Sequence, residues 1–234
     1  MNAEMRRLTD VLAACTLLAL TAPLFGVIVV LNWLTTRRVF FRQTRIGRAL
    51  QPFEILKFQT MIDDAAAGGT ITIQGDRRIT PIGRVLRATK LDELPQLLNV
   101  VSGTMSLVGP RPLTPNEVAA IPPDQARQVY AARPGMTGIS QLVFVHEEEL
   151  LGRAADPAAA YFEVVLPQKV ALELAYARRR TWLTDLGVLV ATPVAGFVPR
   201  LGETIFMRLV PDWSGRRIGE SAPVAWTAPQ RREP

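Results

Sequence analysis

The sequence predicts an α/β fold, a compact membrane-anchored domain with an N-terminal hydrophobic helix and interfacial C-terminal helices. Three observations predict this class. An apolar run near the N-terminus is long enough to enter a bilayer, and short strand patterns alternate with helical segments after it. A later apolar stretch, residues 186–199, is too short to span. We therefore expect a membrane helix over residues 1–36, a globular domain over 37–205 and a tail over 206–234.

Charge and cysteine content narrow the class of partner. The 234 residues include 27 Lys and Arg against 21 Asp and Glu, which gives a formal net charge of +6 and a pI of about 10.2. This balance predicts an anionic partner, either nucleic acid, an anionic membrane surface or a phosphorylated substrate. Cys15 is the single cysteine, which excludes an internal disulfide and cysteine-based zinc binding.

The apolar run covers residues 11–34, where Asn32 is the one strongly polar residue. As a helix it would measure ~36 Å at about 1.5 Å per residue, against a hydrocarbon core of ~30 Å. A cleavable signal peptide fits poorly, because the run is too long and Pro23 directly follows Ala22. No polar face recurs every three or four residues, so an ordinary core helix is also disfavoured.

Two arrangements of this helix in a membrane are open. Arg6 and Arg7 precede the run, and further arginines follow it between residues 37 and 48. Lys and Arg prefer the cytoplasmic side, so charge at both ends disfavours a simple crossing. Pro23 would kink the helix at its middle, and Thr21 is placed to bond back to the freed carbonyls. The pattern favours a re-entrant helix, which enters and leaves by one face, over a single crossing.

Short strands are expected at residues 39–41 and 53–58, with a basic turn containing Gly47 between them. Residues 65–69 read Ala-Ala-Ala-Gly-Gly, which predicts a loop. A helical region is expected to begin near residues 83–86.

Asp92 and Glu93 are adjacent carboxylates in Leu91-Asp92-Glu93-Leu94-Pro95-Gln96-Leu97. Asp and Glu are rarely buried without a partner, so packing explains the pair poorly. A phosphoryl-transfer site explains it better, since one acid can attack phosphorus while the other holds a metal ion. Thr89 fits a capping box that would place both acids in the first turn of a helix, and Pro95 allows a slightly later start. The positive end of the helix dipole would favour ionised carboxylates and bound phosphate there.

The C-terminal half contains stiff Pro- and Gly-rich loops at 108–112 and 133–138. Residues 161–180 have helical character, and Pro193 is expected to interrupt the 186–199 stretch within an interfacial helix pair. The acidic run that His146 opens is expected to be a solvated face. The tail is rich in Pro, Arg and Ser and is expected to be disordered.

Five motifs, in this order, resemble those of the bacterial sugar transferases, the monotopic polyprenyl-phosphate phosphoglycosyl transferases, and the similarity covers roughly residues 5–205. The motifs are Lys57-Phe58-Gln59-Thr60-Met61, Gly75-Asp76-Arg77-Arg78-Ile79-Thr80, Leu86-Arg87 with the segment around Asp92 and Glu93, Ser106-Leu107-Val108-Gly109-Pro110-Arg111-Pro112, and Arg133-Pro134-Gly135-Met136-Thr137-Gly138 with Gln141.

The resemblance implies transfer of a sugar-1-phosphate from a UDP-sugar to a polyprenyl phosphate, which starts a lipid-linked glycan such as an exopolysaccharide, capsule or O-antigen. It implies that Asp92 attacks the phosphorus that bears the sugar, expels UMP and carries a covalent phosphosugar. Glu93 matches the family's magnesium-binding acid, and Mg²⁺ typically binds few carboxylates plus phosphate oxygens. The expected location is the bacterial cytoplasmic (inner) membrane, with the catalytic domain and its active site on the cytoplasmic face against membrane lipid.

Fixed cations are needed where negative charge develops on phosphate oxygens. Lys57, Arg87 and Arg111 match family positions and are candidates for phosphate contact, and Arg133 and Arg78 are further candidates. Each of the first three also has a structural alternative. Lys57 could be a lysine at a strand edge, Arg87 a solvated helix residue, and Arg111 an arginine that ties a loop to a carboxylate. For Asp92 the alternative is a helix-capping acid.

The chain departs from the family pattern at three places. Ala22 stands where the family often has Ser before the proline, Gln59 replaces an arginine of the first motif, and residues 143–153 match no family pattern.

Two functions of other classes are open. One is a catalytically silent membrane module that recruits glycan-assembly partners. The acid pair and the arginines disfavour this alternative. The other is a nucleic-acid-binding protein, but no helix-turn-helix, finger or aromatic RNA-binding motif occurs, so no nucleic-acid partner is expected. The motifs specify neither the sugar nor the oligomeric state.

Overall fold

The computed structural model describes residues 3–62, 76–144 and 147–195. The predicted loop at 65–69, His146 and the tail at 206–234 lie outside these ranges. The elements in chain order are α1 (Ala3–Thr36), β1 (Phe40–Ile46), β2 (Pro52–Phe58), α2 (Pro81–Ala88), α3 (Gln96–Ser102), β3 (Ser106–Val108), α4 (Pro115–Ala119), α5 (Pro123–Val129), β4 (Gly135–Thr137), α6 (Ile139–Val143), α7 (Glu147–Gly152), α8 (Pro157–Ala160), α9 (Leu166–Arg179) and α10 (Trp182–Ala195). The predicted mixture of helices and short strands is confirmed, and the described strands form two separate two-stranded sheets.

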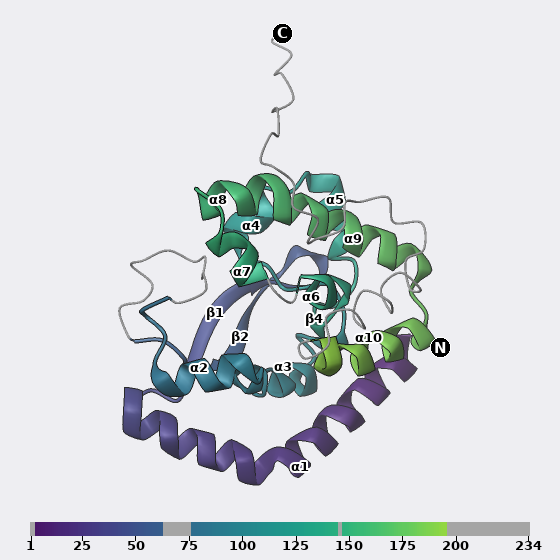
Figure 1. The fold of residues 1–234 in the computed structure, drawn as a ribbon. Helices are drawn as coiled ribbons and strands as arrows, with labels where there is room; N and C mark the ends of the chain where they lie inside the picture. Colours follow the sequence, from purple (N-terminus) through teal and green to yellow (C-terminus); the bar gives the residue numbers. More distant parts are fainter. Residues whose placement is uncertain (1–2, 63–75, 145–146, 196–234) are drawn as a thin grey trace.

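α1 is one helix that bends near its middle, where Pro23 lies inside it (Figure 1). Proline lacks an N–H and its ring clashes with the carbonyl four residues earlier, which is a common cause of a helix bend. Thr21 does bond back, but to the carbonyl of Leu17 at 2.7 Å. The carbonyl left without a donor is that of Ala19, because Pro23 has no N–H to bond to it. The prediction that Thr21 bonds to the freed carbonyl is therefore wrong.

Both ends of α1 are fastened to the same globular unit. Near the N-terminal end, Arg7 donates to the carbonyls of Val100 and Val101 in α3 at 2.5 and 2.8 Å. Near the C-terminal end, the fully buried Asn32 donates to the carbonyl of Gln59 at 3.0 Å. The bent helix therefore runs along the domain and returns to it (Figure 1).

β1 and β2 form an antiparallel hairpin in which Phe40 lies opposite Phe58 and Ile46 opposite Pro52. Both strands lie where they were predicted, and the first continues further than expected. Phe58 packs its ring 4.8 Å from that of Phe25 on α1. Successive side chains of a strand point to opposite faces, so the adjacent Lys57 is directed away from this aromatic cluster.

β3 and β4 are parallel and bring the two Pro- and Gly-rich loops together. The backbones meet at two glycines: a Cβ on Gly135 would lie 2.1 Å from the nitrogen of Gly109. A Cβ on Gly109 would in turn lie 2.3 Å from the carbonyl oxygen of Arg133. Only glycine permits such an approach, which fixes the loop around Arg111 beside the 133–138 loop.

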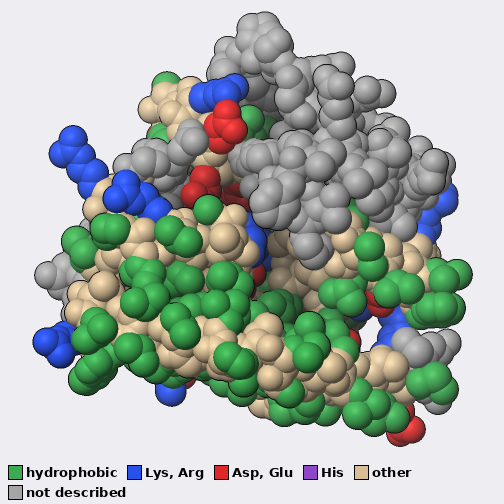
Figure 2. Space-filling view, turned by 60° about the horizontal axis from the view of Figure 1, so that its bottom comes forward, with side chains coloured by type: hydrophobic (Ala, Val, Ile, Leu, Met, Phe, Trp, Pro, Cys, Tyr) green, Lys and Arg blue, Asp and Glu red, His purple; other side chains and the backbone are tan. Residues whose placement is uncertain are grey.

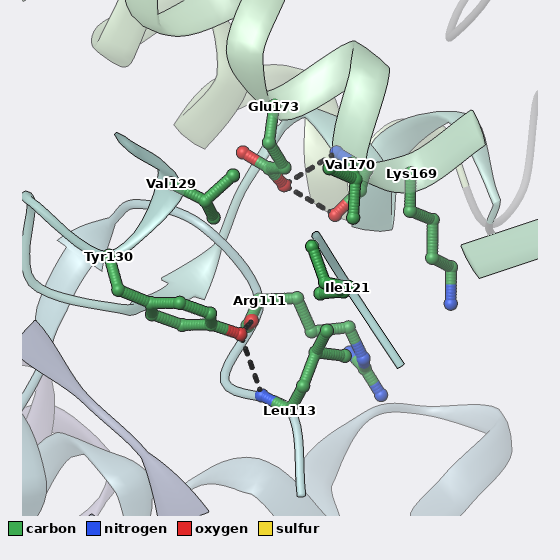
Figure 3. Close-up of a pocket in the computed structure, with 9 residues that line it drawn as sticks. Arg111, Leu113, Ile121, Val129, Tyr130, Lys169, Val170 and Glu173 are labelled. Carbon is green, nitrogen blue, oxygen red and sulfur yellow. Dashed lines mark hydrogen bonds between the residues drawn. The ribbon is translucent and has the colours of Figure 1, made fainter. Parts of the chain in front are cut away.

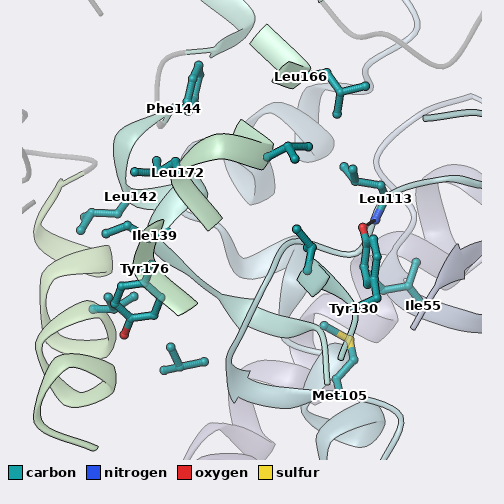
Figure 4. Packing of buried hydrophobic residues seen from close by; sticks show 14 of the residues in the cluster. Ile55, Met105, Leu113, Tyr130, Ile139, Leu142, Phe144, Leu166, Leu172 and Tyr176 are labelled. Carbon is teal, nitrogen blue, oxygen red and sulfur yellow. Dashed lines mark hydrogen bonds between the residues drawn. The ribbon is translucent and has the colours of Figure 1, made fainter. Parts of the chain in front are cut away.

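The main core forms between the helices that follow β3 and the inner faces of β2 and α3. Its buried side chains come from many elements, among them Met105, Tyr130, Ile139, Leu166 and Leu172 (Figure 4). Apolar burial from segments far apart in the chain is the dominant favourable contribution to such a fold.

The predicted helix over 161–180 is confirmed, as a turn of π-helix at Tyr161–Val165 that leads into α9. α10 was expected to be interrupted at Pro193, and this prediction is wrong, because the helix runs from Trp182 to Ala195. The structure describes this helix as far as Ala195, two residues past Pro193, and residues 196–199 of the predicted stretch lie outside the described ranges.

A broad apolar surface covers α1 (Figure 2). Its exposed large side chains on α1 include Leu12, Leu20, Val27, Trp33 and Leu34, and α10 adds Trp182, Leu183, Leu186 and Val190. By length and composition, the helix Glu4–Thr36 could cross a membrane. Of its most apolar 18-residue stretch, 11% is buried inside the protein. Exposed apolar side chains gathered in this way mark a surface that contacts a membrane or another protein.

Candidate active site

The acid pair lies in a short 3₁₀ turn, Leu91–Glu93, between α2 and α3. The capping-box prediction for Thr89 is wrong: α2 ends just before it, and its hydroxyl donates backward to the carbonyl of Val85 at 2.8 Å. Lys90 follows with a left-handed backbone (φ 57°), which separates α2 from the turn that carries the acids. α3 begins at Gln96, directly after Pro95, which is later than the start within a residue or two of the Thr89 cap that was allowed for. The acids therefore stand before its N-terminus and not in its first turn.

Asp92 is a buried carboxylate, 7% exposed, and its Oδ1 has no hydrogen-bond partner among the described residues. Burial raises its pKa above the usual 3.8, opposed by the charge of Lys57 and reinforced by that of Glu93. A buried, unpartnered carboxylate oxygen is costly for folding, so its retention marks a functional candidate.

The pKa of Glu93 is shifted in the opposite direction, downward. Its Oε1 accepts a charge-assisted hydrogen bond from the Lys57 ammonium at 2.8 Å. Burial by itself would raise the pKa of Glu93, but the charges of Lys57 and Arg111 outweigh it and lower the pKa to about 2. Glu93 is therefore fully ionised at neutral pH, as a hard metal ligand needs to be.

A small hollow joins residues of four sequence motifs. Lys57 of β2, Glu93, Arg111 of the 108–112 loop and Gln141 of α6 line it together with Arg45 of β1. Burial would lower the pKa of Arg111, but Glu93 and other nearby anions raise it. Three cations and one carboxylate thus face this hollow, an arrangement that favours a polyanionic ligand.

The other three predicted cations make contacts of their own. Arg87 of α2 forms an ion pair with Glu148 of α7, and its charge also acts on Asp92. Arg78 forms an ion pair with Asp76 at 2.6 Å. Arg133 donates to the carbonyl of Gly103 at 3.0 Å. Lys57 and Arg111 therefore lie in the hollow with Glu93, Arg87 lies near Asp92, and Arg78 and Arg133 bind loop groups.

The acidic run at the start of α7 is solvated in part, since the side chains of Glu148 and Glu149 are 48% and 44% exposed and that of Glu147 is 21% exposed. Two of these glutamates also form ion pairs with other elements. Glu147 pairs with Lys169 of α9 at 2.5 Å, and Glu148 pairs with Arg87. These two contacts tie α7, within the 143–153 segment that matches no family pattern, to elements on two sides of the site.

Several buried polar residues around Arg111 were not identified from the sequence (Figure 3). Tyr130 donates to the carbonyl of Arg111 at 3.1 Å, and Glu173 accepts from the Ser140 hydroxyl at 2.5 Å. Lys169 and Glu173 are four residues apart on α9, and both are under a tenth exposed. Two charged residues on the apolar stripe of a helix were the available signal, because such positions are otherwise hydrophobic.

The residues present fit a magnesium ion that is shared with a substrate. No cluster of three or more His, Cys, Asp or Glu ligands exists in the described part of the chain. Mg²⁺ typically takes one or two carboxylates and completes its octahedron with phosphate oxygens and water. Ionised Glu93 suits that donor set, and the cations beside it would hold the phosphate oxygens that complete it.

A buried carboxylate beside an ionised one, with cations around them, is an arrangement suited to a reaction at phosphorus. The chain belongs to the bacterial sugar transferase family, whose model matches residues 1–198.

Individual relatives agree with this membership. The chain is 47% identical over 143 residues to the UDP-glucose:undecaprenyl-phosphate glucose-1-phosphate transferase of Caulobacter vibrioides, a match that covers 58% of this chain and 53% of the relative. It is 33% identical over 205 residues to the exopolysaccharide production protein PSS of Rhizobium leguminosarum bv. phaseoli, covering 83% and 96%. It is 37% identical over 145 residues to the UDP-N-acetylgalactosamine-undecaprenyl-phosphate N-acetylgalactosaminephosphotransferase of Aeromonas hydrophila, covering 60% and 34%. The match thus spans about half the length of the Caulobacter relative.

Proposed function

We propose that this protein transfers a sugar-1-phosphate from a UDP-sugar to a polyprenyl phosphate and so starts a lipid-linked glycan. The observation that carries the proposal is the buried Asp92, whose Oδ1 has no hydrogen-bond partner among the described residues and whose charge interacts with those of Glu93, Lys57 and Arg87. Relatives named for this reaction use different sugars, glucose and N-acetylgalactosamine, so the sugar of this protein is left to experiment.

Asp92 is the nucleophile of a two-step transfer. In the first step an Asp92 oxygen forms a bond to the phosphorus that bears the sugar. The bond from that phosphorus to the UMP oxygen breaks, and its electron pair leaves with UMP. In the second step an oxygen of the lipid phosphate attacks the same phosphorus, the bond to Asp92 breaks, and the carboxylate is regenerated.

The other residues stabilise charge. Lys57 and Arg111 hold the diphosphate, and Arg87 contacts phosphate close to Asp92 after parting from Glu148. Glu93 would hold Mg²⁺, which when bound neutralises charge on the diphosphate. Arg78 and Arg133 act by holding loops, in line with their contacts to Asp76 and Gly103.

The position of α1 supports a re-entrant anchor at the cytoplasmic face of the inner membrane. Both ends of the helix are fixed to one domain, through Arg7 and Asn32, so the two ends lie on one side of a bilayer if the domain does. The apolar surface of α1 and α10 would enter the lipid and bring the acid pair to the level of the lipid phosphate.

The test is intact-protein mass spectrometry of the full-length wild type and Asp92→Asn after incubation with Mg²⁺ and a panel of UDP-sugars, without lipid acceptor. We expect a mass gain of one sugar phosphate in the wild type, with release of UMP, and neither in the variant. Polyprenyl phosphate added next should remove the adduct. UMP release that needs no Asp92, or the absence of any UMP release from all donors with the lipid present, would overturn the proposal.

A further inference from the structure

We propose that Arg45 of β1 is a further cation that contacts the donor diphosphate, with its Nε–H donating to a phosphate oxygen in the hollow. The inference rests on the proposed function, because the ligand is the diphosphate of the UDP-sugar. Arg45 lies outside the five motifs that the sequence analysis singled out.

The register of the hairpin places Arg45 beside Lys57 (Figure 1). Lys57 of β2 lies opposite Phe41, and Arg45 lies four residues further along β1, so the two basic side chains share one face of the strand pair. Both line the hollow, together with Glu93 and Arg111. Arg45 is therefore positioned to reach the same ligand as the cations already described.

Two of the three guanidinium nitrogens of Arg45 are bound within the protein. Nη1 donates to the carbonyl of Pro112 and to Oε2 of Glu117, both at 3.3 Å, and Nη2 donates to the Gln43 side chain at 2.6 Å. Nε is buried and has no hydrogen-bond partner among the described residues. A buried donor of a charged group is costly to leave without an acceptor, so its presence at a hollow indicates where a ligand oxygen binds.

Buried side-chain atoms of this kind are rare in the described part of the chain. They are Oδ1 of Asn32, Oδ1 of Asp92 and Nε of Arg45. Two of the three thus belong to the acid pair and to the hollow. One diphosphate would satisfy both, since its phosphorus is the target of a carboxylate oxygen and its oxygens accept from an N–H.

Glu117 of α4 holds the guanidinium of Arg45 in place. Its Oε2 also accepts from the backbone N–H of Thr114 at 2.6 Å and from the Thr114 hydroxyl at 2.7 Å, and its Oε1 accepts from the Tyr161 hydroxyl. A carboxylate with these bonds is fixed, and the Arg45 side chain paired with it is 19% exposed. Little side-chain freedom is left to lose when a phosphate binds.

Charge favours a phosphate over the neutral parts of the donor. Burial lowers the pKa of Arg45, Glu117 raises it, and the like charge of Arg111 lowers it further. Two arginines on one small hollow repel each other, and a bound anion relieves this repulsion. A diphosphate supplies the anion and accepts charge-assisted hydrogen bonds, whereas the uracil and the sugar hydroxyls are neutral.

The experiment observes the donor directly, by NMR of the Nε–H groups in full-length protein with isotope-labelled arginine in detergent micelles. The Arg45 resonance is the one that the Arg45→Lys variant lacks. The probes are UDP with Mg²⁺, pyrophosphate with Mg²⁺, and uridine. Arg42 is the control, because it lies three residues from Arg45, hence on the other face of β1, with a side chain 65% exposed.

We expect UDP and pyrophosphate to shift the Arg45 Nε–H resonance downfield, because its proton gains a phosphate acceptor, and uridine to leave it in place. The Arg42 resonance should not move with any probe. An Arg45 resonance that stays in place while calorimetry on the same sample shows saturating UDP binding would overturn the inference. So would an equal shift with uridine, or the absence of binding by both phosphate probes.

Calorimetry of two variants gives a second measurement. Arg45→Lys keeps the charge and loses the Nε–H, and Arg42→Lys is the same change on the other face of the strand. The Kd for UDP with Mg²⁺ should rise about tenfold in Arg45→Lys, as for the loss of one charge-assisted hydrogen bond, and stay at the wild-type value in Arg42→Lys. An unchanged Kd in Arg45→Lys would contradict the contact. Should Arg45→Lys fold poorly, sequential assignment identifies the resonance and the wild-type titration decides by itself.

Neither measurement needs turnover, so the two proposals can fail separately. Absent UMP release by a wild type whose Arg45 responds to pyrophosphate would reject the transfer reaction and keep the phosphate contact. UMP release by a wild type whose Arg45 does not respond would reject the contact and keep the reaction.

Discussion

Asp92 and Glu93 are neighbours in the chain, yet the fold shifts their pKa values in opposite directions. Burial raises the pKa of Asp92, while Lys57 and Arg111 overcome burial at Glu93 and lower its pKa to about 2. Two carboxylates with separated pKa values are suited to two roles. Burial favours the protonated form of Asp92, whereas one strand lysine and one loop arginine keep Glu93 ionised.

The raised pKa of Asp92 predicts a stability gain when the acid is removed. The folded state binds a proton at Asp92 more tightly than the unfolded chain, so its contribution to stability is full below the usual pKa of 3.8. That contribution is lost as pH rises through the higher pKa of the folded state. Asp92→Asn should therefore melt a few °C above the wild type at pH 8, and the difference should shrink at lower pH.

Thermal unfolding in detergent between pH 5 and 8 measures this effect. Asp124→Asn is the control, because its side chain is 84% exposed. If Asp92→Asn melts below the wild type at pH 8, Asp92 has a structural role, such as the helix-capping acid that the sequence left open.

At the scale of elements, α7 connects two sides of the site. Glu147 binds Lys169 of α9, and Glu148 binds Arg87 of α2. Arg87 is a candidate for phosphate contact, so in this structure a carboxylate stands where a phosphate oxygen would be expected. An incoming diphosphate would have to compete with Glu148 for the same guanidinium.

Removing this competition predicts tighter binding of the nucleotide. Glu148→Gln should lower the Kd for UDP with Mg²⁺ by up to about fivefold, since a half-exposed ion pair contributes about 1 kcal/mol or less. Calorimetry measures the change, with Glu149→Gln as control, because Glu149 lies on the same helix and pairs with Arg153, the residue just after its end. Unchanged or weaker binding by Glu148→Gln would place Arg87 outside the UDP phosphate site.

At the scale of the whole molecule, α1 follows the domain along its length and contacts it at both ends. The bend at Pro23 lets a helix of membrane length return to the domain that it leaves, and the apolar side chains of α1 and α10 stay exposed. A domain attached to lipid in this way would hold its site at the interface, where a soluble donor and a membrane-bound acceptor can meet.

The re-entrant arrangement predicts that both ends of α1 are accessible from the cytoplasm. Cys15 is the single cysteine, so a Cys15→Ala background allows Glu4→Cys and Arg42→Cys to be labelled individually. A membrane-impermeant maleimide should label both variants in inverted vesicles and neither in intact spheroplasts. Labelling of Glu4→Cys from the spheroplast exterior would show a single crossing.

The sequence alone predicted the long apolar helix, the hairpin strands, the family and the acid pair. Each of these depends on local pattern: the length of an apolar run, alternation in a strand, or residues close together in a motif. It could not place Thr89, because α2 ends before this residue and its hydroxyl bonds back to the carbonyl of Val85. It also expected an interruption at Pro193, through which α10 continues to Ala195.

The tertiary structure decided which distant groups meet. Lys57 reaches Glu93 across 36 positions, Ser140 reaches Glu173 across 33, and α7 is tied to elements on both sides of the site. The close approach of backbones at Gly109 and Gly135 likewise joins two loops that are distant in the chain, and burial changes the strength of the charge interactions. A linear pattern shows which chemical groups are available, whereas burial and distance, which set pKa values and orientation, exist only after the chain has packed.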